Sequence, residues 1–389
     1  MIAEQRGLPG SDRPLRVLWL IKGLGAGGAE RLVEQSARHR DRAAIEPAVA
    51  YLLTEKSTLV ASLEYEGCTP VECLDVRSSW DPRWTLRLRK LLIASDFDVV
   101  HIHSPLVAVG TRLVIRTLPR RKRPRIVVTE HNVWSSHAPV TRWADRLTAG
   151  RGEVHLAVSA AVLESMPKAL RGESRVVRYG IDAAEIRRLA PDRAAVRQKL
   201  AIADDEVLVG TVANLRATKG YPDLLRAAAT VARETGHGTD GPVVKFVSIG
   251  RGPMSDELES LRAELGLGDR FEFLGFRPDA VELMSAFDIF CLASHHEGLP
   301  IVLMEALALG LPVVATRVGG IEEIVTDGVE AVLVPPRQPD RLARALIDLA
   351  RAPQRRAEMA QRSRDRGELL DAPTTVATIE GVYREIVAR

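Results

Sequence analysis

The first half of the chain alternates short apolar runs with segments of helical periodicity. Leu15–Ile21 is an almost continuous apolar run, and Ala29–His39 after it repeats apolar residues at the spacing of a helix. Near-continuous apolar strands are typical of a parallel sheet that is covered on both faces. Further strands of this kind are predicted at Ile45–Leu53, Asp98–Ile102, Arg125–Thr129, Val154–Val158 and Arg175–Arg178. We therefore predict a doubly wound α/β unit.

The second half repeats this rhythm. Strands are predicted at Val207–Val212, Val243–Ile249, Phe271–Phe273, Ile289–Leu292, Pro312–Ala315 and Ala331–Val334. We predict an α/β fold in which two Rossmann-like domains, residues 1–185 and 186–373, face each other across a cleft. The tail, residues 374–389, is predicted to form an amphipathic helix that could pack on either domain, including back on the first.

The composition is that of a two-domain globular protein. The chain has 389 residues, of which 46% are hydrophobic and 27% charged, and this excludes a disordered chain. Three cysteines cannot build a disulfide framework, which favours a reducing compartment. The polar start has no apolar core of a signal peptide, and no run reaches the length of a membrane span. We expect a cytoplasmic protein, at most peripheral at the inner face of the membrane.

The charge is unevenly distributed between the two halves. The formal charge is +7 over residues 1–185 and −4 over the remainder. The excess gathers at Arg83, Arg87, Arg89, Lys90, Arg120, Arg121, Lys122, Arg123 and Arg125. These residues are interpreted either as solvated surface or as a face for anionic lipid or a phosphorylated acceptor. Aromatic residues make up only 4% of the chain, too few for a base-stacking platform, so nucleic acid is not an expected partner.

A glycine-rich turn follows the first predicted strand. Gly23, Gly25 and Gly28 match G-x-G-x-x-G where a strand passes into a helix, a context that suits phosphate binding. The alternative is a tight packing turn. The acid expected ~20 residues later in a dinucleotide site is absent there, since Glu55 lies 27 residues after Gly28. A nicotinamide dehydrogenase therefore remains only as an alternative.

The segment around residues 297–310 carries two acids beside a predicted helix. A loop holds Glu297, a helix is predicted from Ile301 to Leu309, and Gly310 supplies its stop. Glu305 lies just over one turn into this helix and leans back toward the loop. Two carboxylates and the amides of Gly298 through Ile301 would then converge at a helix N-terminus. This arrangement suits the diphosphate, ribose and sugar of a nucleotide-sugar.

Glu297 and Glu305 form the Glu-(x)7-Glu pattern, and the surrounding EGLPIVLMEALALGLPVVATRVGGIEEIV resembles glycosyltransferase family 4 (glycosyl transferases group 1), the retaining enzymes of the GT-B fold. Further matching segments are GGAERLV (27–33), DVVHIHSP (98–105), VVTEHN (127–132), ANLRATKGYPDLLRA (213–227), IGRGP (249–253) and FLGF (273–276). The resemblance covers almost the full chain and implies a GT-B fold, with acceptor binding in the first domain and donor binding in the second.

The resemblance also implies roles for individual residues. Lys219 would grip the donor diphosphate; the family's arginine partner is replaced here by Asn214, and Arg216 is a substitute for it. His131 would reach the transferred sugar, whereas His101 and His103 are interpreted as structural. The implied catalytic residues are Glu297, His131, Lys219 and Arg216. The implied donor-binding residues are Gly25, Gly27, Gly28, Asn214, Arg216, Lys219, Gly275, Phe276, Gly298, Leu299, Pro300, Ile301 and Glu305.

The function that the resemblance implies is retaining transfer of a hexosyl group. The donor would be a UDP- or GDP-sugar, and the acceptor a hydroxyl of a glycan, a polyprenyl-phosphate-linked or other lipid-linked molecule, or a small molecule. We interpret the chain as lacking an Asp-x-Asp metal motif, since its adjacent acid pairs, Asp204–Asp205–Glu206, Asp256–Glu257 and Glu322–Glu323, are not spaced that way. We therefore expect no metal, and no cofactor beyond the nucleotide-sugar as co-substrate. A GT-B-fold sugar-nucleotide epimerase and a non-catalytic nucleotide-sugar-binding protein remain as alternatives.

Overall fold

The computed structural model describes residues 13–25, 27–150, 152–236 and 241–389, which form two compact units. Unit 1 extends to Tyr179 and also contains Ala372–Arg389; unit 2 comprises Gly180–Asp371. The unit boundary lies six residues before the predicted one, and the C-terminal segment begins two residues earlier than predicted. The polar start, residues 1–12, lies outside the described residues.

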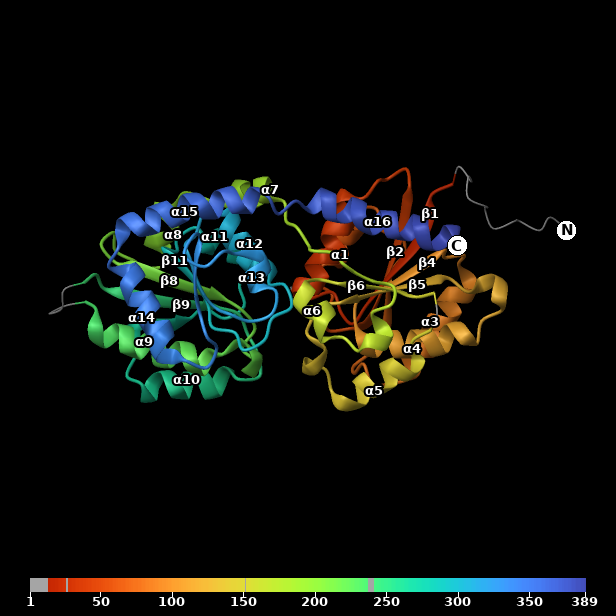
Figure 1. Ribbon diagram of the computed structural model, residues 1–389, viewed down its shortest axis with the longest axis horizontal. Coiled ribbons are helices and arrows are strands. Elements are labelled where there is room, and N and C mark those ends of the chain that lie inside the picture. The colour runs from red at the N-terminus through yellow and green to blue at the C-terminus, as the bar shows by residue number, and fades with distance from the viewer. Residues whose placement is uncertain (1–12, 26, 151, 237–240) are drawn as a thin grey trace. The chain divides into compact units, whose positions relative to one another are not determined.

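Unit 1 is built on a seven-stranded parallel sheet in the order β3-β2-β1-β4-β5-β6-β7. Its strands are β1 (Leu15–Ile21), β2 (Ile45–Leu53), β3 (Val71–Val76), β4 (Val99–Ile102), β5 (Arg125–Glu130), β6 (Val154–Ala157) and β7 (Ser174–Val176). Its helices are α1 (Gly28–His39), α2 (Val60–Tyr65), α3 (Arg83–Ala94), α4 (Pro105–Arg116), α5 (Pro139–Thr148), α6 (Ala160–Ser165) and α16 (Ala372–Ala388). Figure 1 shows α1 and α16 on one side of this sheet and α3, α4 and α5 on the other.

Unit 2 is built on a six-stranded parallel sheet in the order β10-β9-β8-β11-β12-β13. Its strands are β8 (Val207–Val212), β9 (Val244–Ile249), β10 (Phe271–Phe273), β11 (Ile289–Leu292), β12 (Val313–Thr316) and β13 (Ala331–Val334). Its helices are α7 (Ala183–Leu189), α8 (Arg193–Lys199), α9 (Tyr221–Glu234), α10 (Ser255–Glu264), α11 (Ala280–Met284), α12 (Ile301–Ala308), α13 (Ile321–Ile324), α14 (Pro339–Ala350) and α15 (Pro353–Glu368).

The central strands are buried on both faces, as their continuous apolar runs predict. Every residue of β11 and of β12 is buried, and so are Val17–Ile21 of β1. One strand of unit 1, β3, is not foreseen from the sequence. It lies at the sheet edge, and its polar residues Glu72 and Asp75 interrupt the apolar run that marks the inner strands.

In each sheet the direction in which successive strands are added reverses once. Strands are added outward from β1 toward β3, and the chain then crosses over to β4; in unit 2 the same reversal separates β8 from β11. Ligands of doubly wound folds bind beyond the carboxyl ends of the strands at such a switch point. In unit 2 the loops after β8 and β11 carry Lys219 and Glu297 to this position.

The C-terminal helix α16 belongs to unit 1. Trp19 Nε1 of β1 donates a hydrogen bond to Tyr383 Oη at 3.1 Å, and the Asp41 amide donates to Glu380 at 2.9 Å. Thr375 donates to the carbonyl of Arg178 at 2.9 Å. Within the described part of the chain, no helix is long and apolar enough to cross a membrane.

Candidate active site

An ion pair between Lys219 and Glu297 lies at the switch point of unit 2. Lys219 Nζ lies 2.7 Å from Glu297 Oε1 and 2.8 Å from Oε2. The Glu297 side chain is buried, whereas that of Lys219 keeps about a quarter of its surface exposed. Ser294, fully buried, donates a further hydrogen bond to Glu297 Oε1 at 2.5 Å. The carboxylate is therefore held by three hydrogen bonds, and the lysine remains accessible from solvent.

Lys219 reaches Glu297 because the two loops are joined through their backbones. Thr218 O accepts hydrogen bonds from the amides of His295 and His296, at 2.8 and 3.3 Å. Gly220 has φ +64°, and a Cβ there would overlap the carbonyl oxygen of Ala293 at the end of β11. Only glycine combines this left-handed conformation with such a close approach. The Lys-Gly step thus sets the distance between the two loops.

A second glycine fixes the Glu297 backbone. Gly319 has φ +55°, and a Cβ there would overlap the carbonyl oxygen of Glu297. The neighbouring Gly320 amide donates to Gly298 O at 2.8 Å. Thr316, at the end of β12, donates to Ser294 O at 2.5 Å. The loop that carries Glu297 is therefore clamped between the ends of β11 and β12.

Helix α12 begins immediately after this loop, as the sequence predicts. Pro300 is the residue that precedes its first turn, and no side chain caps its N-terminus. The amides of Gly298, Leu299 and Ile301 make no hydrogen bond to any of the described residues. The sequence-based expectation of donors from Gly298 through Ile301 would give four amides. Pro300 has no N–H, so only three are available. These amides and the positive end of the helix dipole make a position that suits an anion.

Glu305 lies on helix α12, and Gly310 ends this helix, as the sequence predicts. Glu305 is buried on α12, 8% exposed, five residues into the helix. Gly310 has φ +74°; its amide bonds Leu307 O, and the Leu311 amide bonds Ala306 O, as at a glycine-terminated helix. The helix ends at Ala308, one residue before the predicted end. Whether Glu297 and Glu305 bind one ligand stays a prediction.

Three further loops of unit 2 lie together at the carboxyl ends of β8, β9 and β10. The Gly250 amide donates to Gly275 O at 2.8 Å, and the Leu215 amide donates to Arg251 O at 3.2 Å. The guanidinium carbon of Arg251 lies 5.1 Å from the centre of the Phe276 ring, which is 42% exposed. Phe276 is thus a half-exposed aromatic face held by a cation–π contact.

Asn214 and Arg216, in the loop after β8, are exposed. Asn214 and Arg216 both point away from the core, and the described residues offer no hydrogen bond or ion pair to the Arg216 guanidinium. An exposed, uncommitted guanidinium three residues before Lys219 is compatible with the predicted contact to phosphate. The same loop also contributes the Leu215 carbonyl, which accepts from the Met254 amide at 3.2 Å.

In unit 1 the predicted His131, itself partly exposed, joins a chain of aromatic rings whose other members are buried. His131 Nε2 lies 3.2 Å from His103 Nδ1, and its ring stacks on Tyr179 at 5.9 Å between ring centres. Burial lowers the pKa of His131 to about 3, with a further contribution from His137. His131 is therefore neutral at pH 7 and acts as a hydrogen-bonding group and not as a cation.

His101 ties this cluster to the C-terminal helix. Its Nδ1 lies 2.6 Å from Tyr383 Oη and its Nε2 2.6 Å from Thr129 Oγ1. Since Trp19 donates to Tyr383, the tyrosine hydroxyl can donate to Nδ1 and leave Nε2–H for Thr129. Burial lowers the pKa of His101 to about 3. These contacts agree with the structural role predicted for His101.

The glycine-rich turn of unit 1 leads into α1. Gly27 precedes the first turn of α1, Gly28 is its first residue, and Gly25 lies just before. A Cβ at Gly27 would overlap the carboxylate of Glu30, whose pKa is raised by burial. A carboxylate therefore lies beside the helix N-terminus that the phosphate prediction uses, and phosphate binding by Gly25, Gly27 and Gly28 stays a prediction.

The expectation that the chain lacks an Asp-x-Asp pair is wrong, because Asp96 and Asp98 form one in the first half. Asp98 is held by Arg13 through two hydrogen bonds of 2.8 and 2.9 Å and by the Arg16 amide, and Asp96 is bound by Lys122. The pair lies at the amino end of β4, whereas His103 follows its carboxyl end. Its carboxylates serve structural ion pairs. The described residues contain no cluster of three or more metal-ligating side chains.

Several residues that shape this site were not predicted from the sequence. Ser294, Thr218 and Gly319 position Glu297, and Arg251 backs Phe276. His295 Nε2 lies 2.7 Å from Asp223 in the first turn of α9, which adds a further tie between the loops. The paired glycines Gly319-Gly320 and the arginine within IGRGP were visible signals. The serine carried no signal of its own, because its role depends on the neighbouring strand.

Two doubly wound parallel sheets, each with its loops gathered at a switch point, define the GT-B class of fold. Two family models match the chain: Glycosyltransferase Family 4 over residues 26–185 and Glycosyl transferases group 1 over residues 192–366. Together they account for most of the chain, one model for each unit. The chain therefore belongs to the group 1 (family 4) glycosyltransferases.

Known relatives agree with this family. A D-inositol 3-phosphate glycosyltransferase from Saccharomonospora viridis is 32% identical over 254 residues, 63% of this chain but only 56% of that relative's length. An alpha-D-kanosaminyltransferase from Streptomyces kanamyceticus is 28% identical over 326 residues, 78% of this chain and 81% of the relative. A GDP-mannose-dependent mannosyltransferase that acts on phosphatidylinositol monomannoside, from Mycolicibacterium smegmatis, is 29% identical over 72% of this chain and 74% of its own length.

The structural neighbours share the fold. The crystal structure of Anabaena HepE with UDP and glucose matches with a TM-score of 0.80 at 23% identity, over 95% of this chain and 99% of the neighbour. Sucrose-phosphate synthase from Thermosynechococcus elongatus matches with a TM-score of 0.79 at 17% identity, over 96% and 99%. At these identities the likeness is one of fold.

Proposed function

We propose that the protein is a retaining, metal-independent hexosyltransferase that takes its sugar from a nucleotide-sugar and passes it to a hydroxyl group of an acceptor. The observation that carries the proposal is the Lys219–Glu297 pair at the switch point of unit 2, beside three backbone amides that have no acceptor among the described residues. A cation, a carboxylate and unpaired amides are the groups that a sugar diphosphate requires.

Lys219 and the amides of α12 act on the leaving group. As the bond between the anomeric carbon and the diphosphate breaks, negative charge grows on the phosphate oxygens. Lys219 Nζ and the amides of Gly298, Leu299 and Ile301 stabilise that charge because they are already oriented. The exposed Arg216 guanidinium adds a further positive charge. Asn214 lies in the same loop as this cation pair.

Glu297 acts on the sugar. Its carboxylate accepts hydrogen bonds from the sugar hydroxyls and favours the positive charge that develops at the anomeric carbon. Glu305 accepts from the ribose diol, and the Gly275–Phe276 loop lies beside the base. His131 contacts the transferred sugar from unit 1 as a neutral imidazole.

The stereochemistry follows from the leaving group. The acceptor oxygen bonds to the anomeric carbon on the face from which the diphosphate departs, so the configuration is retained. The departing phosphate oxygen takes the proton of the acceptor hydroxyl, and no side-chain base is required. The acceptor is a glycan, a lipid-linked molecule or a small molecule, and we favour a lipid-linked one at the inner face of the membrane.

Nucleotide-sugar screening tests this function. In a thermal-shift screen with UDP-, GDP- and ADP-sugars, the cognate donor should raise the unfolding temperature as ln(1+[L]/Kd) predicts. Product formation should depend on both donor and acceptor and persist in EDTA. Conversion of the donor without acceptor would indicate an epimerase, and binding without turnover a non-catalytic protein. An absolute need for Mg²⁺ or Mn²⁺ would contradict the metal-independent mechanism, and NADH binding would favour a dehydrogenase.

A further inference from the structure

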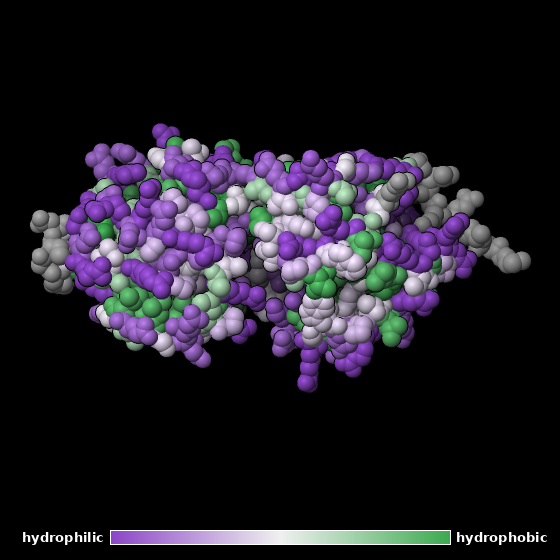
Figure 2. Space-filling model, turned by 60° about the horizontal axis from the view of Figure 1, so that its bottom comes forward, coloured by the Kyte–Doolittle hydropathy of each residue, from purple (hydrophilic) through white to green (hydrophobic). Residues whose placement is uncertain are grey.

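Helix α5 of unit 1 has its polar side toward the core and its apolar side toward solvent. Thr141 and Asp145 are buried, whereas Val140, Trp143 and Leu147 are 55%, 66% and 60% exposed. Residues three, four and seven apart share one face of a helix, so the three exposed residues form one stripe. Figure 2, in which the underside of Figure 1 comes forward, shows hydrophobic residues exposed among hydrophilic ones on this part of unit 1.

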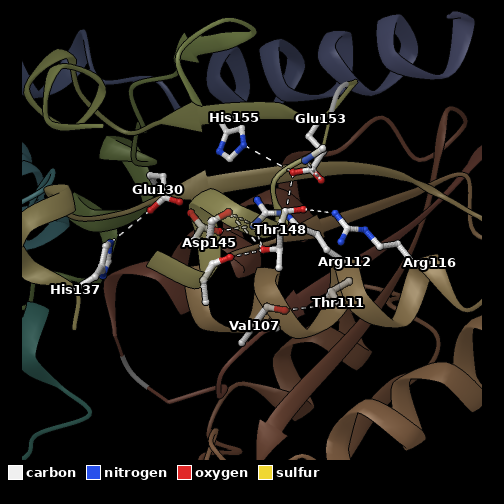
Figure 3. Close-up of polar contacts among 12 residues, drawn as sticks. Val107, Thr111, Arg112, Arg116, Glu130, His137, Asp145, Thr148, Glu153 and His155 are labelled. Carbon is white, nitrogen blue, oxygen red and sulfur yellow. Dashed lines mark hydrogen bonds and ion pairs between the residues drawn. The ribbon is translucent and has the colours of Figure 1, made fainter. Parts of the chain in front are cut away.

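The inside-out orientation of α5 is imposed by a buried arginine. Arg112 of α4, 2% exposed, donates to the Asp145 carboxylate and to Glu153 Oε2 at 2.8 Å. It also donates to Thr148 Oγ1 at 3.3 Å, and Figure 3 shows Asp145 and Thr148 directed toward it. A buried guanidinium without its carboxylates would be strongly destabilising. Helix α5 therefore cannot roll inward to hide its apolar stripe without breaking these ion pairs.

Basic side chains flank the stripe. Arg142 and Arg146 lie on α5 itself, beside the apolar residues. At the C-terminal end of α5, Arg116 of α4 donates to Thr148 O at 2.7 Å, and its own carbonyl accepts from Arg123. Helices α3, α4 and α5 contain a single acid, Asp145, and it is buried. The surface around the stripe thus has no acid from these three helices to offset its arginines.

We propose that α5 docks unit 1 onto an anionic lipid bilayer, with Val140, Trp143 and Leu147 in the headgroup region and Arg142, Arg146 and Arg116 facing lipid phosphates. An apolar stripe with a tryptophan and flanking arginines is the pattern of a helix that lies in a membrane interface. This inference deepens the proposed function, on which it rests for the lipid-linked acceptor.

A bilayer fits the stripe better than a second copy of the chain does. A two-fold contact through α5 would bring the same arginines together with no acid from these helices to compensate them. One ten-residue helix is also narrow beside the ~800 Å² per partner of a standard protein interface. Immersion of three side chains in a headgroup region needs no such area, and phosphates supply the missing negative charge.

Vesicle sedimentation of the full chain, without any nucleotide-sugar, tests this surface. The protein should bind vesicles of phosphatidylglycerol and phosphatidylcholine, bind pure phosphatidylcholine at least tenfold more weakly, and be released by salt. The triple variant V140S/W143S/L147S should lose binding at least tenfold, and R142Q/R146Q should lose the salt-sensitive part. The matched controls Y65S and L369S replace apolar residues of other segments, at 88% and 73% exposure, and should bind as the wild type does.

Brominated lipids give an independent readout. When the protein binds vesicles that contain brominated lipid, tryptophan fluorescence should be quenched in the wild type and not in W143F, because Trp143 is the tryptophan on the stripe. Wild-type binding by the triple variant, or equal loss in the controls, would overturn the proposal. Self-association without lipid that the triple variant abolishes would instead assign the stripe to a second copy. Nucleotide-sugar thermal shifts of the triple variant should equal those of the wild type, so failure of donor binding would count against the proposed function and not against this surface.

Discussion

The ammonium group of Lys219 lies within 2.8 Å of both carboxylate oxygens of Glu297, although 78 residues separate the two in the chain. The parallel sheet makes this contact, because β8 and β11 are neighbours and their carboxyl-end loops meet at the switch point. Without a ligand each group neutralises the other. A bound diphosphate would compete for the lysine, and the released carboxylate would face the sugar.

Glu297→Gln should abolish most of the transfer activity without unfolding the protein. The amide keeps the size of the side chain but loses the negative charge that favours a cationic anomeric carbon. We expect kcat to fall on the order of 10²-fold or more. Steady-state kinetics with the cognate donor checks this, with circular dichroism as the control for folding. Turnover equal to the wild type would remove Glu297 from the mechanism.

Glu305→Ala should chiefly weaken nucleotide binding. Glu305 is buried on α12, where a carboxylate can accept two hydrogen bonds from a ribose diol. Charge-assisted hydrogen bonds contribute about 1.5–3 kcal/mol each, so the dissociation constant should rise by about tenfold or more. Calorimetric titration with the nucleoside diphosphate measures the change. An unaltered affinity would count against the assignment.

Lys219→Met and Glu297→Gln should not be additive in stability. Removing the lysine leaves a buried carboxylate without its partner, at a cost of about 1–3 kcal/mol. The double variant should recover part of the stability that the lysine variant loses. Urea unfolding of the four proteins should give an interaction free energy of about 0.5–3 kcal/mol. The more exposed pair Glu259 and Arg262 on α10 provides a comparison cycle, for which we expect an interaction free energy of less than about 1 kcal/mol. Additive effects at both pairs would show that the Lys219–Glu297 contact carries no stability.

Gly319→Ala should displace the loop that carries Glu297. A Cβ at position 319 would overlap the Glu297 carbonyl oxygen, in addition to the strain of its positive φ. Gly328→Ala is the matched control, since Gly328 has φ +81° but no atom within 4 Å of the added carbon. Both variants should lose about 1 kcal/mol from backbone strain. Only G319A should also lose transfer activity, so equal activities would contradict the positioning role.

Acid should destabilise the protein through histidines whose pKa is lowered in the folded state. Burial lowers the pKa of His101 and His131 to about 3 and that of His155 to about 4, whereas the unfolded chain titrates near 6.5. The unfolded state therefore binds more protons below pH 6.5. The stability that neutral histidines provide is complete above that pH and is lost as the pH falls toward 4.

The contribution of one histidine can be isolated by difference. Each of these groups steepens the dependence of the unfolding free energy on pH by up to about 1.4 kcal/mol per pH unit. His101→Gln should remove about that slope between pH 6 and pH 4.5, measured by denaturant unfolding at several pH values. His296→Gln, which replaces an exposed histidine, serves as the control. An unchanged slope in H101Q would contradict the linkage.

Local pattern was enough to predict most strands and the end of α12. The central strands Val207–Val212 and Ile289–Leu292 were predicted residue for residue, because a strand buried on both faces requires a continuous apolar run. The edge strand β3 was missed because its polar residues Glu72 and Asp75 interrupt the apolar run. The family signature around Glu297 identified the candidate site before any contact was known.

Tertiary structure alone decided the long-range contacts. Nothing near Lys219 indicates that it pairs with Glu297, since the pairing depends on which strands are neighbours. Tyr383 meets Trp19 across 364 residues because the tail returns to unit 1. The spacing of Val140, Trp143 and Leu147 would by itself place α5 with these residues inward. The need of the buried Arg112 for carboxylate partners reverses that orientation, and such a need exists only once the helices are packed together.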